Sequence, residues 1–557
     1  MRSPLVSRTG SVLLATLALA AGPVAAQDGP WALTNARILT VTRGVIERGT
    51  IVIRDGLIAA VGADVTAPAD ARVLDLAGRT VSPAFIDLTS SLGLAAAAPA
   101  VAGRPAAAGG PPAAAATGTE PANVGLEPQR LVADEIRPSA TDVRTARDAG
   151  FGAVLVAPNR GAFRGLSALV PLRDSVASRN VLRSPVALHM GYQGTMGRYP
   201  GTLMGVIAYE RQAFHDARRL GLLQERYRAS PRGMERPAYD ARLSALVPVV
   251  RGELPVLFAA SNENEIRRAL AMGREFELRL TVVGATEAFR AVDALTASRR
   301  PVVVSVDFPR APEVTGWSFR AGQRLPLNDS AAADSAVRRV VEANAATLNG
   351  AGIRVALASG GSLRGAEIIT NVRKAIAAGL PRDVALEALT IRPAEIAGVA
   401  DQLGSVEVGK IANLVVTEGE PLTDSAKVRA VFVDGVRYEV VAAAAGRGRG
   451  GPGGGSATQL AGTWTVTVNS PQGTQTMTMT VTPEGPGFSG TMASEMGTLP
   501  IADGQVSGTS VSWAVTIPAG GQSLTVTFRG ELEGNRLRGT AELGAYGSAP
   551  FTAEKNP

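Results

Sequence analysis

The sequence predicts an α/β barrel in residues 81–403, flanked by β-rich segments, and a second, all-β module in residues 458–557. In the first region, short apolar runs alternate with helical segments, as expected of parallel strands buried on both faces. Their number is close to eight, which favours a closed, TIM-like (β/α)8 barrel over an open sheet. In the second region, polar and apolar residues alternate almost throughout, which indicates half-buried antiparallel strands.

The first 26 residues have the pattern of a secretory signal peptide. Arg2 and Arg8 give a positive start, residues 11–22 are apolar, and Val24-Ala25-Ala26 offers small residues for cleavage. The apolar run is too short to span a bilayer, and the alternative is a buried N-terminal helix. Because the chain has no cysteine, disulfides and a lipid anchor on cysteine are excluded. We therefore expect a periplasmic or secreted protein with no membrane span.

Charge and composition exclude two classes of partner. The net charge is +7, but the excess is spread along the chain and forms no basic block with interleaved aromatic residues. We therefore expect no nucleic-acid binding. Aromatic residues make up only 4% of the chain, so a carbohydrate-stacking surface is not indicated either.

The β-rich flanks are residues 27–80 and 404–441. Strand-like runs are predicted at 32–42, 50–54, 57–61, 73–76, 414–417, 428–433 and 436–441. Asp55-Gly56 and Asp434-Gly435 each separate two of these runs, and an Asp-Gly pair in that position is a strong hairpin signal.

The barrel region supplies strands and helices in turn. The predicted strands are Val81–Ile86, Ala153–Val156, Val186–His189, Pro255–Ala259, Arg279–Val283, Val302–Val306 and Arg354–Ala358. The predicted helices are Ala140–Ala149, Leu203–Leu222, Glu263–Glu275, Thr286–Ser298, Asp334–Leu348 and Asp383–Ala388. Residues 95–119 are rich in alanine, glycine and proline, which indicates a flexible insertion at the barrel rim.

Residues 442–457 form a Gly-rich linker to the C-terminal module. In that module, strands are predicted at 463–468, 476–482, 510–517, 523–529 and 536–542. Turn signals recur between them, as in an antiparallel sandwich or a small barrel. Gly462-Thr463-Trp464 resembles a lipocalin-like β module, so both architectures stay open.

Two stretches carry a resemblance to a known family. Residues 81–87, Val-Ser-Pro-Ala-Phe-Ile-Asp, resemble the V-x-P-G-F-I-D strand that opens the barrel of the amidohydrolase superfamily. Residues 385–435 follow the closing segment of that superfamily in order and spacing, with Leu403-Gly404-Ser405-Val406-Glu407 and Gly409-Lys410. The nearest branch is imidazolonepropionase-like or prolidase-like. The resemblance implies that 27–80 and 404–441 join in a composite β-sandwich, and that the family activity is hydrolysis of non-peptide or dipeptide C–N bonds.

The resemblance also implies zinc or a similar divalent metal at the barrel mouth, but the ligand positions are substituted. The positions where the family carries histidine or aspartate hold Thr89, Ser91, Ala259, Val283 and Gly360. No lysine precedes Lys374, so a bridging lysine has no candidate, and the chain has only two histidines. Hydroxyl groups are poor zinc ligands. We therefore predict no metal cofactor.

A few side chains remain as catalytic candidates. Asp307 ends a strand, and His189 follows another, so each could face the barrel mouth. Ser91 and Ser359 would need such a base as nucleophiles. The alternatives are that His189 is a packed histidine and that His215 is a polar residue on a helix face.

Three functions follow from this pattern. The first is a pseudoenzyme, kept as a partner in a homo-oligomer or in a hetero-oligomer with an active amidohydrolase. The second is a hydrolase of cyclic amides or small peptides that works through an unrecognised site. The third is a periplasmic protein that binds a small molecule or peptide at the barrel mouth.

Overall fold

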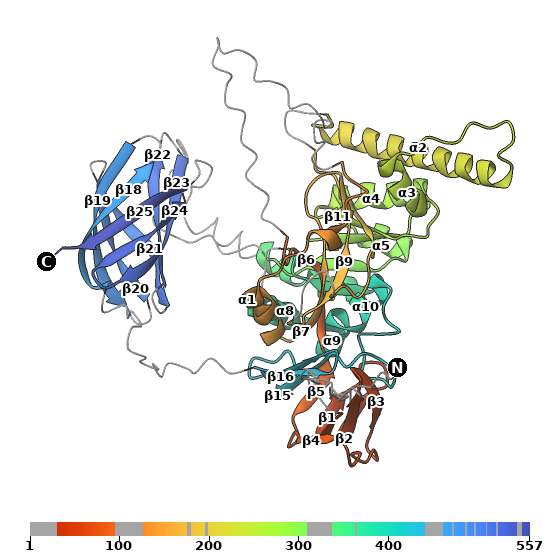
Figure 1. The fold of residues 1–557 in the computed structure, drawn as a ribbon, viewed down its shortest axis with the longest axis horizontal. Helices are drawn as coiled ribbons and strands as arrows, with labels where there is room; N and C mark the ends of the chain where they lie inside the picture. Colours follow the sequence, from red (N-terminus) through yellow and green to blue (C-terminus); the bar gives the residue numbers. More distant parts are fainter. Residues whose placement is uncertain are drawn as a thin grey trace, which may run out of the picture. The chain divides into compact units, whose positions relative to one another are not determined.

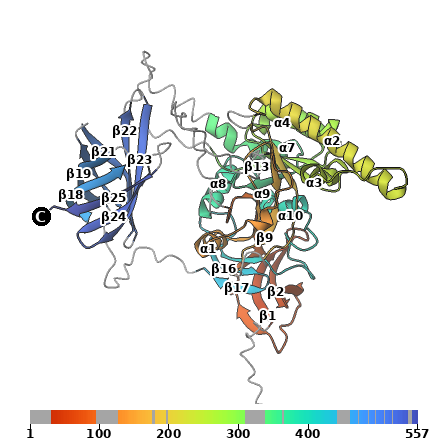
Figure 2. The ribbon, with the colours of Figure 1, turned by 45° about the horizontal axis from the view of Figure 1, so that its top comes forward.

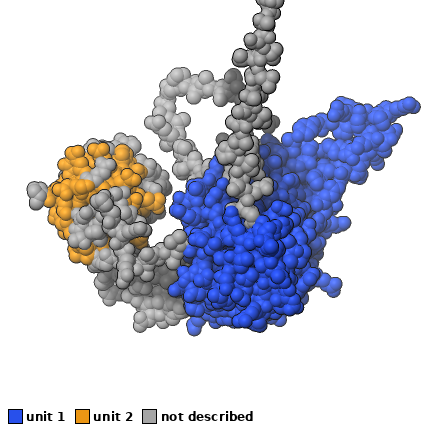
Figure 3. All heavy atoms as spheres, turned by 60° about the horizontal axis from the view of Figure 1, so that its bottom comes forward, with its two compact units in different colours: residues 1–96, 111–442 blue, residues 97–110, 443–557 orange. Residues whose placement is uncertain are grey.

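In the computed structural model, the chain divides into two compact units (Figure 3). The first comprises residues 1–96 and 111–442, and the second residues 97–110 and 443–557. The structure describes residues 30–94, 126–174, 180–194, 199–308, 337–361, 365–440, 460–470, 473–484, 487–494, 497–507, 510–519, 522–542 and 548–556. The predicted signal peptide, the 95–119 insertion and the 442–457 linker lie outside these residues.

Strands from both flanks form one eight-stranded sheet (Figure 1). They are β1 Trp31–Leu39, β2 Val45–Arg54, β3 Leu57–Gly62, β4 Arg72–Asp75, β5 Thr80–Pro83, β15 Leu414–Glu418, β16 Lys427–Val433 and β17 Val436–Glu439. The order is β17-β16-β15-β5-β1-β2-β3 with β4 beside β1, so the β15–β5 ladder joins the two flanks. Leu33, Ile53 and Phe432 share one core, so this single sheet curls over side chains from both its ends.

Both Asp-Gly pairs form the predicted hairpin turns. Asp55 and Gly56 have φ of 52° and 78°, and Asp434 and Gly435 have φ of 50° and 77°. Two successive residues with positive φ are the geometry of the type I′ turn, whose twist matches that of the strands it joins. The pattern that predicted β2–β3 and β16–β17 is therefore confirmed.

The predicted strand Val81–Ile86 is divided between two sheets. β5 ends at Pro83 in the flank sheet, and β6 (Phe85–Ser90) begins two residues later in the barrel. The boundary thus falls at Ala84 rather than at residue 80. A continuous apolar run does not reveal where a strand leaves one sheet for another, because both halves are buried.

The barrel strands lie in two described ladders. These strands are β6, β7 Phe151–Val156, β8 Phe163–Leu166, β9 Ala168–Pro171, β10 Leu188–Gly191, β11 Val256–Ala260, β12 Leu280–Gly284, β13 Val302–Ser305 and β14 Val355–Ala358. One ladder has the order β6-β7-β9, and the other β14-β13-β12-β11-β10-β8. β10 to β14 are parallel to one another, as predicted.

One barrel strand runs against the others. β8 and β9 follow each other with only Ser167 between them, and they pair antiparallel with β10 and β7. The chain returns from β7 through the short segment 157–162, and a link of that length can join only antiparallel neighbours. The prediction of an all-parallel barrel is therefore wrong for residues 163–171. Together, β8 and β9 connect the two ladders.

Some of the helices of the first unit, but not all, begin at a capping side chain. The helices are α1 Ala140–Asp148, α2 Leu203–Ala229, α3 Ala241–Val250, α4 Glu263–Glu275, α5 Val292–Ser298, α7 Asn344–Gly350, α8 Ala366–Ala377, α9 Arg382–Leu389 and α10 Ile391–Ala397, with the 3-10 helices η1 Val132–Asp134 and η3 Ala288–Arg290. Ser139, Thr202, Asp240 and Asn262 accept backbone hydrogen bonds at the starts of α1 to α4. α2 extends beyond the strands together with α3 (Figure 2).

Alternate residues of the barrel strands face two different cores. Ala187, Leu257, Val283 and Ala356 belong to an inner cluster that α10 also joins. The neighbouring residues, such as Met190 and Phe258, pack outward against the helices. Because side chains alternate along a strand, this division tells which positions point into the barrel.

The second unit is a closed antiparallel barrel, which decides between the two predicted architectures. Its strands are β18 Gly462–Ser470, β19 Gly473–Glu484, β20 Gly487–Ser494, β21 Gly497–Ser507, β22 Ser510–Ala519, β23 Gln522–Glu533, β24 Arg536–Glu542 and β25 Ser548–Lys555. β18 closes the circle by pairing with β25. Trp464, Trp513, Phe528 and Phe551 fill its interior, and the Trp513 and Phe528 rings are stacked at 4.9 Å.

Within the described part of the chain, no helix combines the length and the apolar character needed to cross a membrane.

Candidate functional site

A buried carboxylate ties the last barrel strand to the first. Asp87 of β6 is 4% exposed, and its Oδ1 accepts hydrogen bonds from the backbone N–H of Ser359 at 2.9 Å and of Thr89 at 3.2 Å. The Ser359 hydroxyl donates to Asp87 Oδ2 at 2.6 Å. The backbone N–H of Gly360 donates to Thr89 Oγ1 at 2.9 Å. We call Asp87, Thr89, Ser359 and Gly360 the seam cluster, because no described ladder joins β14 to β6.

The seam cluster is saturated with hydrogen bonds. Burial raises the pKa of Asp87, and the hydrogen bonds from Ser359 and Thr89 oppose that rise. Since these donors already occupy both carboxylate oxygens, Asp87 is engaged in holding the strand ends together. Its geometry is that of a structural group.

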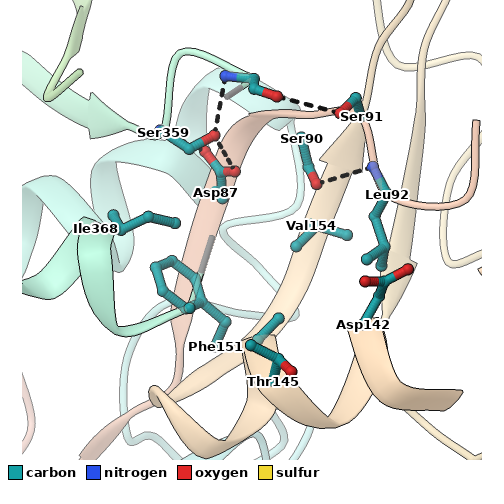
Figure 4. Close-up of a pocket in the computed structure, with 13 residues that line it drawn as sticks. Asp87, Ser90, Ser91, Leu92, Asp142, Thr145, Phe151, Val154, Ser359 and Ile368 are labelled. Carbon is teal, nitrogen blue, oxygen red and sulfur yellow. Dashed lines mark hydrogen bonds between the residues drawn. The ribbon is translucent and has the colours of Figure 1, made fainter. Parts of the chain in front are cut away.

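A small cavity lies beside this seam (Figure 4). Its volume is about 40 Å³, and Ser90, Phe151, Val154, Thr145 and Ile368 are among its lining residues. A space of this size holds only a few water molecules. It is therefore too small for a substrate.

The positions predicted to have lost metal ligands lie at the carboxyl ends of the barrel strands. Ala259 is directly opposite Val283 in the β11–β12 ladder, and Thr89 contacts Gly360 at the seam. Ser91 donates to the carbonyl oxygen of Gly361 at 3.1 Å.

These positions do not fit a divalent metal. The side chains at these positions are methyl, isopropyl and hydroxyl groups, whereas zinc requires nitrogen, sulfur or carboxylate donors. At Gly360, φ is 73° and an added Cβ would collide with the Ser305 hydroxyl, so an aspartate there requires that hydroxyl to rotate away and a backbone conformation that favours glycine. Among the described residues, no three His, Cys, Asp or Glu side chains gather in a group able to hold an ion.

Asp307 lies at the same edge as the seam cluster. It is exposed, its backbone N–H donates to Ser305 Oγ at 3.1 Å, and its Cβ would lie 3.3 Å from a Cβ added to Gly360. The structure thus places Asp307 at the barrel mouth, where a catalytic carboxylate would be useful.

His189 points into the barrel but contacts none of the other candidates. It is directly opposite Leu257 of the inner cluster in the β10–β11 ladder, and it is 5% exposed. Its Nε2 has no hydrogen-bond partner in the described part of the chain. Burial, and then the charge of Arg164, lower the pKa of His189 to about 3, so the ring is neutral at neutral pH. Ser91 and Ser359 bond elsewhere, so no serine–histidine pair forms among them.

The structure adds Arg164, which the sequence did not single out. Arg164 lies on β8, and its Nε donates to the carbonyl oxygen of Gly161 at 3.2 Å. A Cβ added to Gly191 would lie 2.7 Å from Arg164 Nη2 and 3.3 Å from the Ala259 Cβ. The guanidinium therefore lies over Gly191, beside Ala259, one of the positions predicted to have lost a metal ligand. Burial lowers the pKa of Arg164 to about 10, which leaves it charged at neutral pH.

One buried carboxyl group lies near Arg164, and a buried hydroxyl group lies near that carboxyl. Glu210 of α2 is fully buried, and neither carboxyl oxygen has a hydrogen-bond partner among the described residues. Burial raises the pKa of Glu210 well above its usual range, although Arg164 opposes that rise. The Tyr192 hydroxyl is also buried without a partner in the described part of the chain, and burial raises its pKa. We call Arg164, His189, Tyr192 and Glu210 the arginine cluster.

The sequence held one signal for this cluster. Glu210 lies four residues after Val206 and four before Phe214, in the middle of the buried face of α2. A charged residue in such a stripe marks a special position. No comparable pattern predicts Arg164, because it lies on the antiparallel strand β8, which the pattern did not reveal.

Residues 254–442 match the model of the amidohydrolase family. The predicted resemblance is confirmed. An amidohydrolase from Thermotoga maritima has 22% identity and a TM-score of 0.59, over 73% of this chain and 99% of that chain. At that identity, the similarity shows a shared fold.

Two further solved structures are similar at lower scores. A prolidase complexed with N-methylphosphonate-L-proline has 18% identity and a TM-score of 0.43, over 74% of this chain and 99% of its own. A Xaa-Pro dipeptidase with methionine in its active site has 16% identity and a TM-score of 0.45, over 74% and 100%. These TM-scores are too low to support an assignment to the prolidase-like branch, so that assignment stays a prediction. No curated protein matches the chain.

Proposed function

We propose that this chain is a non-catalytic relative of the amidohydrolases, in which the barrel binds a ligand or a partner and does not activate water on a metal. The observation that carries the proposal is the set of side chains at the barrel mouth. Thr89, Ala259, Val283 and Gly360 offer no ligand that zinc prefers. The family chemistry depends on such a metal to generate hydroxide near neutral pH.

The saturated seam cluster supports the same proposal. The Asp87 carboxylate accepts hydrogen bonds from Ser359 and Thr89, so it is engaged in holding the ends of β14 and β6 together. A residue that replaced the missing aspartate at position 360 would displace Ser305.

The export of this protein, and its place in the periplasm or outside the cell, form part of the proposal. They rest on the signal-peptide pattern of residues 1–26. An N-terminal sequence of the mature, secreted protein beginning at Gln27 is the expected result. A chain recovered from the cell interior with Met1 intact would contradict it.

Metal content and turnover test the central claim. The full chain is purified from metal-supplemented medium, dialysed and measured by elemental analysis beside a histidine-complete amidohydrolase treated in the same way. We expect no stoichiometric zinc, manganese or iron, and no hydrolysis of dipeptides or cyclic amides. About one retained metal ion per chain, together with turnover, would overturn the proposal.

One alternative has a specific observation in its favour. Asp307 is exposed at the barrel mouth, where it could serve a hydrolase that works through an unrecognised site. If hydrolysis is found, its loss in Asp307→Asn and in His189→Gln would support that hydrolase. His215→Gln is the matched control, since His215 is the other histidine of the chain and lies exposed on α2.

A further inference from the structure

The outer face of α2 presents a continuous stripe of exposed side chains. Val206, Ala213 and Ala217 are buried on the inner face of this helix. The positions on the opposite face recur at intervals of three and four residues, which places them one above the other along the helix. All of them are exposed: Met204, Ala208, Arg211, His215, Arg219, Leu222 and Arg226. We call this set the outer stripe.

The outer stripe continues onto a part of the helix that leaves the body of the unit. The last buried residue of α2 is Gly221, and the next buried residue along the chain is Leu246 of α3. The segment between them contributes no residue to the hydrophobic core. Figure 2 shows the end of α2 projecting beyond the strands. At about 1.5 Å per residue, the stripe from Met204 to Arg226 forms a ridge about 33 Å long.

The same part of the chain is basic. Residues 218–251 contain eight arginines and three acidic residues, so they carry a net charge of +5, compared with +7 for the whole chain. Two of the three acidic side chains are engaged, since Glu225 pairs with Arg251 at 2.6 Å and Asp240 caps the start of α3. These charges form no block in the sequence, and the packing of α3 against α2 brings them together.

The outer stripe combines unpaired charge with exposed apolar side chains. Arg219 and Arg226 form no ion pair within the described part of the chain. Leu222 lies between them and is 62% exposed, and Met204 at the start of the stripe is 80% exposed. Like charges disfavour a second copy of the same face as the partner. Arginine interspersed with apolar side chains on one helix face is typical of segments that lie on an anionic membrane surface.

We propose that the outer stripe of α2 binds to the surface of a bilayer that contains anionic phospholipid, without crossing that bilayer. The guanidinium groups of Arg219 and Arg226 meet lipid phosphates, which match the fork of donors that arginine supplies. Met204 and Leu222 contact the head-group region, where apolar side chains leave water. The proposal goes beyond the proposed function, because it involves neither the barrel mouth nor its chemistry.

Vesicle sedimentation with the full chain tests this binding. We expect binding to vesicles of phosphatidylcholine and phosphatidylglycerol in equal parts, and binding at least about tenfold weaker to phosphatidylcholine alone, because only the first surface is negatively charged. Added salt should weaken the binding, since it screens exposed charges. Soluble poly-L-glutamate serves as the probe for an acidic protein partner.

Two variants locate the surface. The double variant Arg219→Gln with Arg226→Gln removes two charges from the outer stripe and should weaken vesicle binding about tenfold or more. Leu222→Ser keeps every charge and should weaken vesicle binding about fivefold, since it removes an apolar side chain from the contact. Arg299→Gln with Arg300→Gln is the matched control, because it removes two exposed charges away from α2 and should bind as the wild type does. Circular dichroism verifies that each variant is folded.

The outcomes decide the proposal separately from the proposed function. Equal binding to the two kinds of vesicle, no binding to either, or a control as weak as the Arg219 and Arg226 variant would overturn the membrane surface. Poly-L-glutamate bound as tightly as vesicles, with Leu222→Ser unchanged, would also overturn it and would indicate an acidic protein partner. Hydrolysis of dipeptides would overturn the non-catalytic function, yet it would leave the membrane surface standing.

Discussion

The seam cluster and the arginine cluster are both buried polar groups of one barrel, but only one of them is satisfied. Asp87 receives hydrogen bonds from two backbone N–H groups and a hydroxyl. Glu210, His189 and Tyr192 each keep at least one buried polar atom without a partner among the described residues.

The difference separates a structural role from a binding role. A saturated carboxylate holds strands together and has little left to offer a ligand. A buried polar group without a hydrogen-bond partner lowers the stability of the fold. A protein retains such a group where it serves another purpose, such as ligand binding. The predictions that follow test this difference between the two clusters, and they are ordered by the size of the effect that we expect.

Loss of the seam carboxylate should be the most damaging change. Asp87→Ala leaves the N–H and hydroxyl groups of Ser359 without their acceptor at a buried site. We expect the free energy of unfolding to fall by about 3 kcal/mol. Urea denaturation measures it, with the exposed Asp64→Ala as control. A change as small as that of the control would mean that the seam does not hold the strand ends together.

Acidification should destabilise the protein through His189. The folded protein keeps this ring neutral to a pKa of about 3, whereas the unfolded chain protonates it near the ordinary value of 6.5. Stability is therefore present above pH 6.5 and is lost as the pH falls below it. Between about pH 6.5 and about pH 5, the loss due to this residue is about 2 kcal/mol.

Two histidine variants test that slope. His189→Gln should flatten the dependence of the urea midpoint on pH in this window, and His215→Gln should leave it as in the wild type. Since the chain has only these two histidines, the two variants together cover every imidazole of the protein. If only His215→Gln flattens the pH dependence of the urea midpoint, that dependence is due to His215 and not to His189.

Replacement of the unsatisfied carboxyl should stabilise the protein. Glu210→Met fills a similar volume without a polar group, and the free energy of unfolding should rise by about 1 kcal/mol. The pKa of Glu210 is raised, so the wild type loses stability as the pH climbs above the ordinary value of 4.5. The gain from Glu210→Met should therefore grow with pH.

Whether Glu210→Met raises or lowers the free energy of unfolding distinguishes an unsatisfied group from a structural one. Glu235→Gln, at an exposed position between α2 and α3, is the control and should change little. If Glu210→Met destabilises the protein as Asp87→Ala does, Glu210 is a structural group and the contrast between the two clusters disappears.

The smallest effect concerns the edge of the seam. Ser91→Ala removes one hydrogen bond, from the hydroxyl to the carbonyl oxygen of Gly361. We expect a loss of about 0.5–1 kcal/mol in the free energy of unfolding, measured by urea denaturation. A loss as large as that of Asp87→Ala would extend the seam cluster to Ser91.

Much of the fold followed from local patterns. The predicted helix Glu263–Glu275 matches α4, and the runs predicted around residues 255–259, 279–283 and 354–358 became β11, β12 and β14. Apolar period and turn residues act over a few positions, so they can be recognised without knowledge of the rest of the chain. The two Asp-Gly hairpins are the clearest case.

Other features of the fold depended on the direction of each strand and on the strand with which it pairs. Residues 163–171 form a strand of the barrel, but their mixed composition and reversed direction were not visible in the apolar pattern. The division of the 81–86 run between two sheets was hidden for a related reason, since both halves are buried.

The sequence by itself determined which chemical groups the chain possesses: two histidines, no lysine before Lys374, and threonine, alanine, valine and glycine at the positions where the resemblance predicts metal ligands. Only the tertiary structure decided which groups meet. Arg164 lies beside Gly191 and Ala259 because an antiparallel strand places β8 against β10. Composition limits the available chemistry, whereas the charge and hydrogen bonds that a group experiences depend on neighbours brought together by strand direction and register.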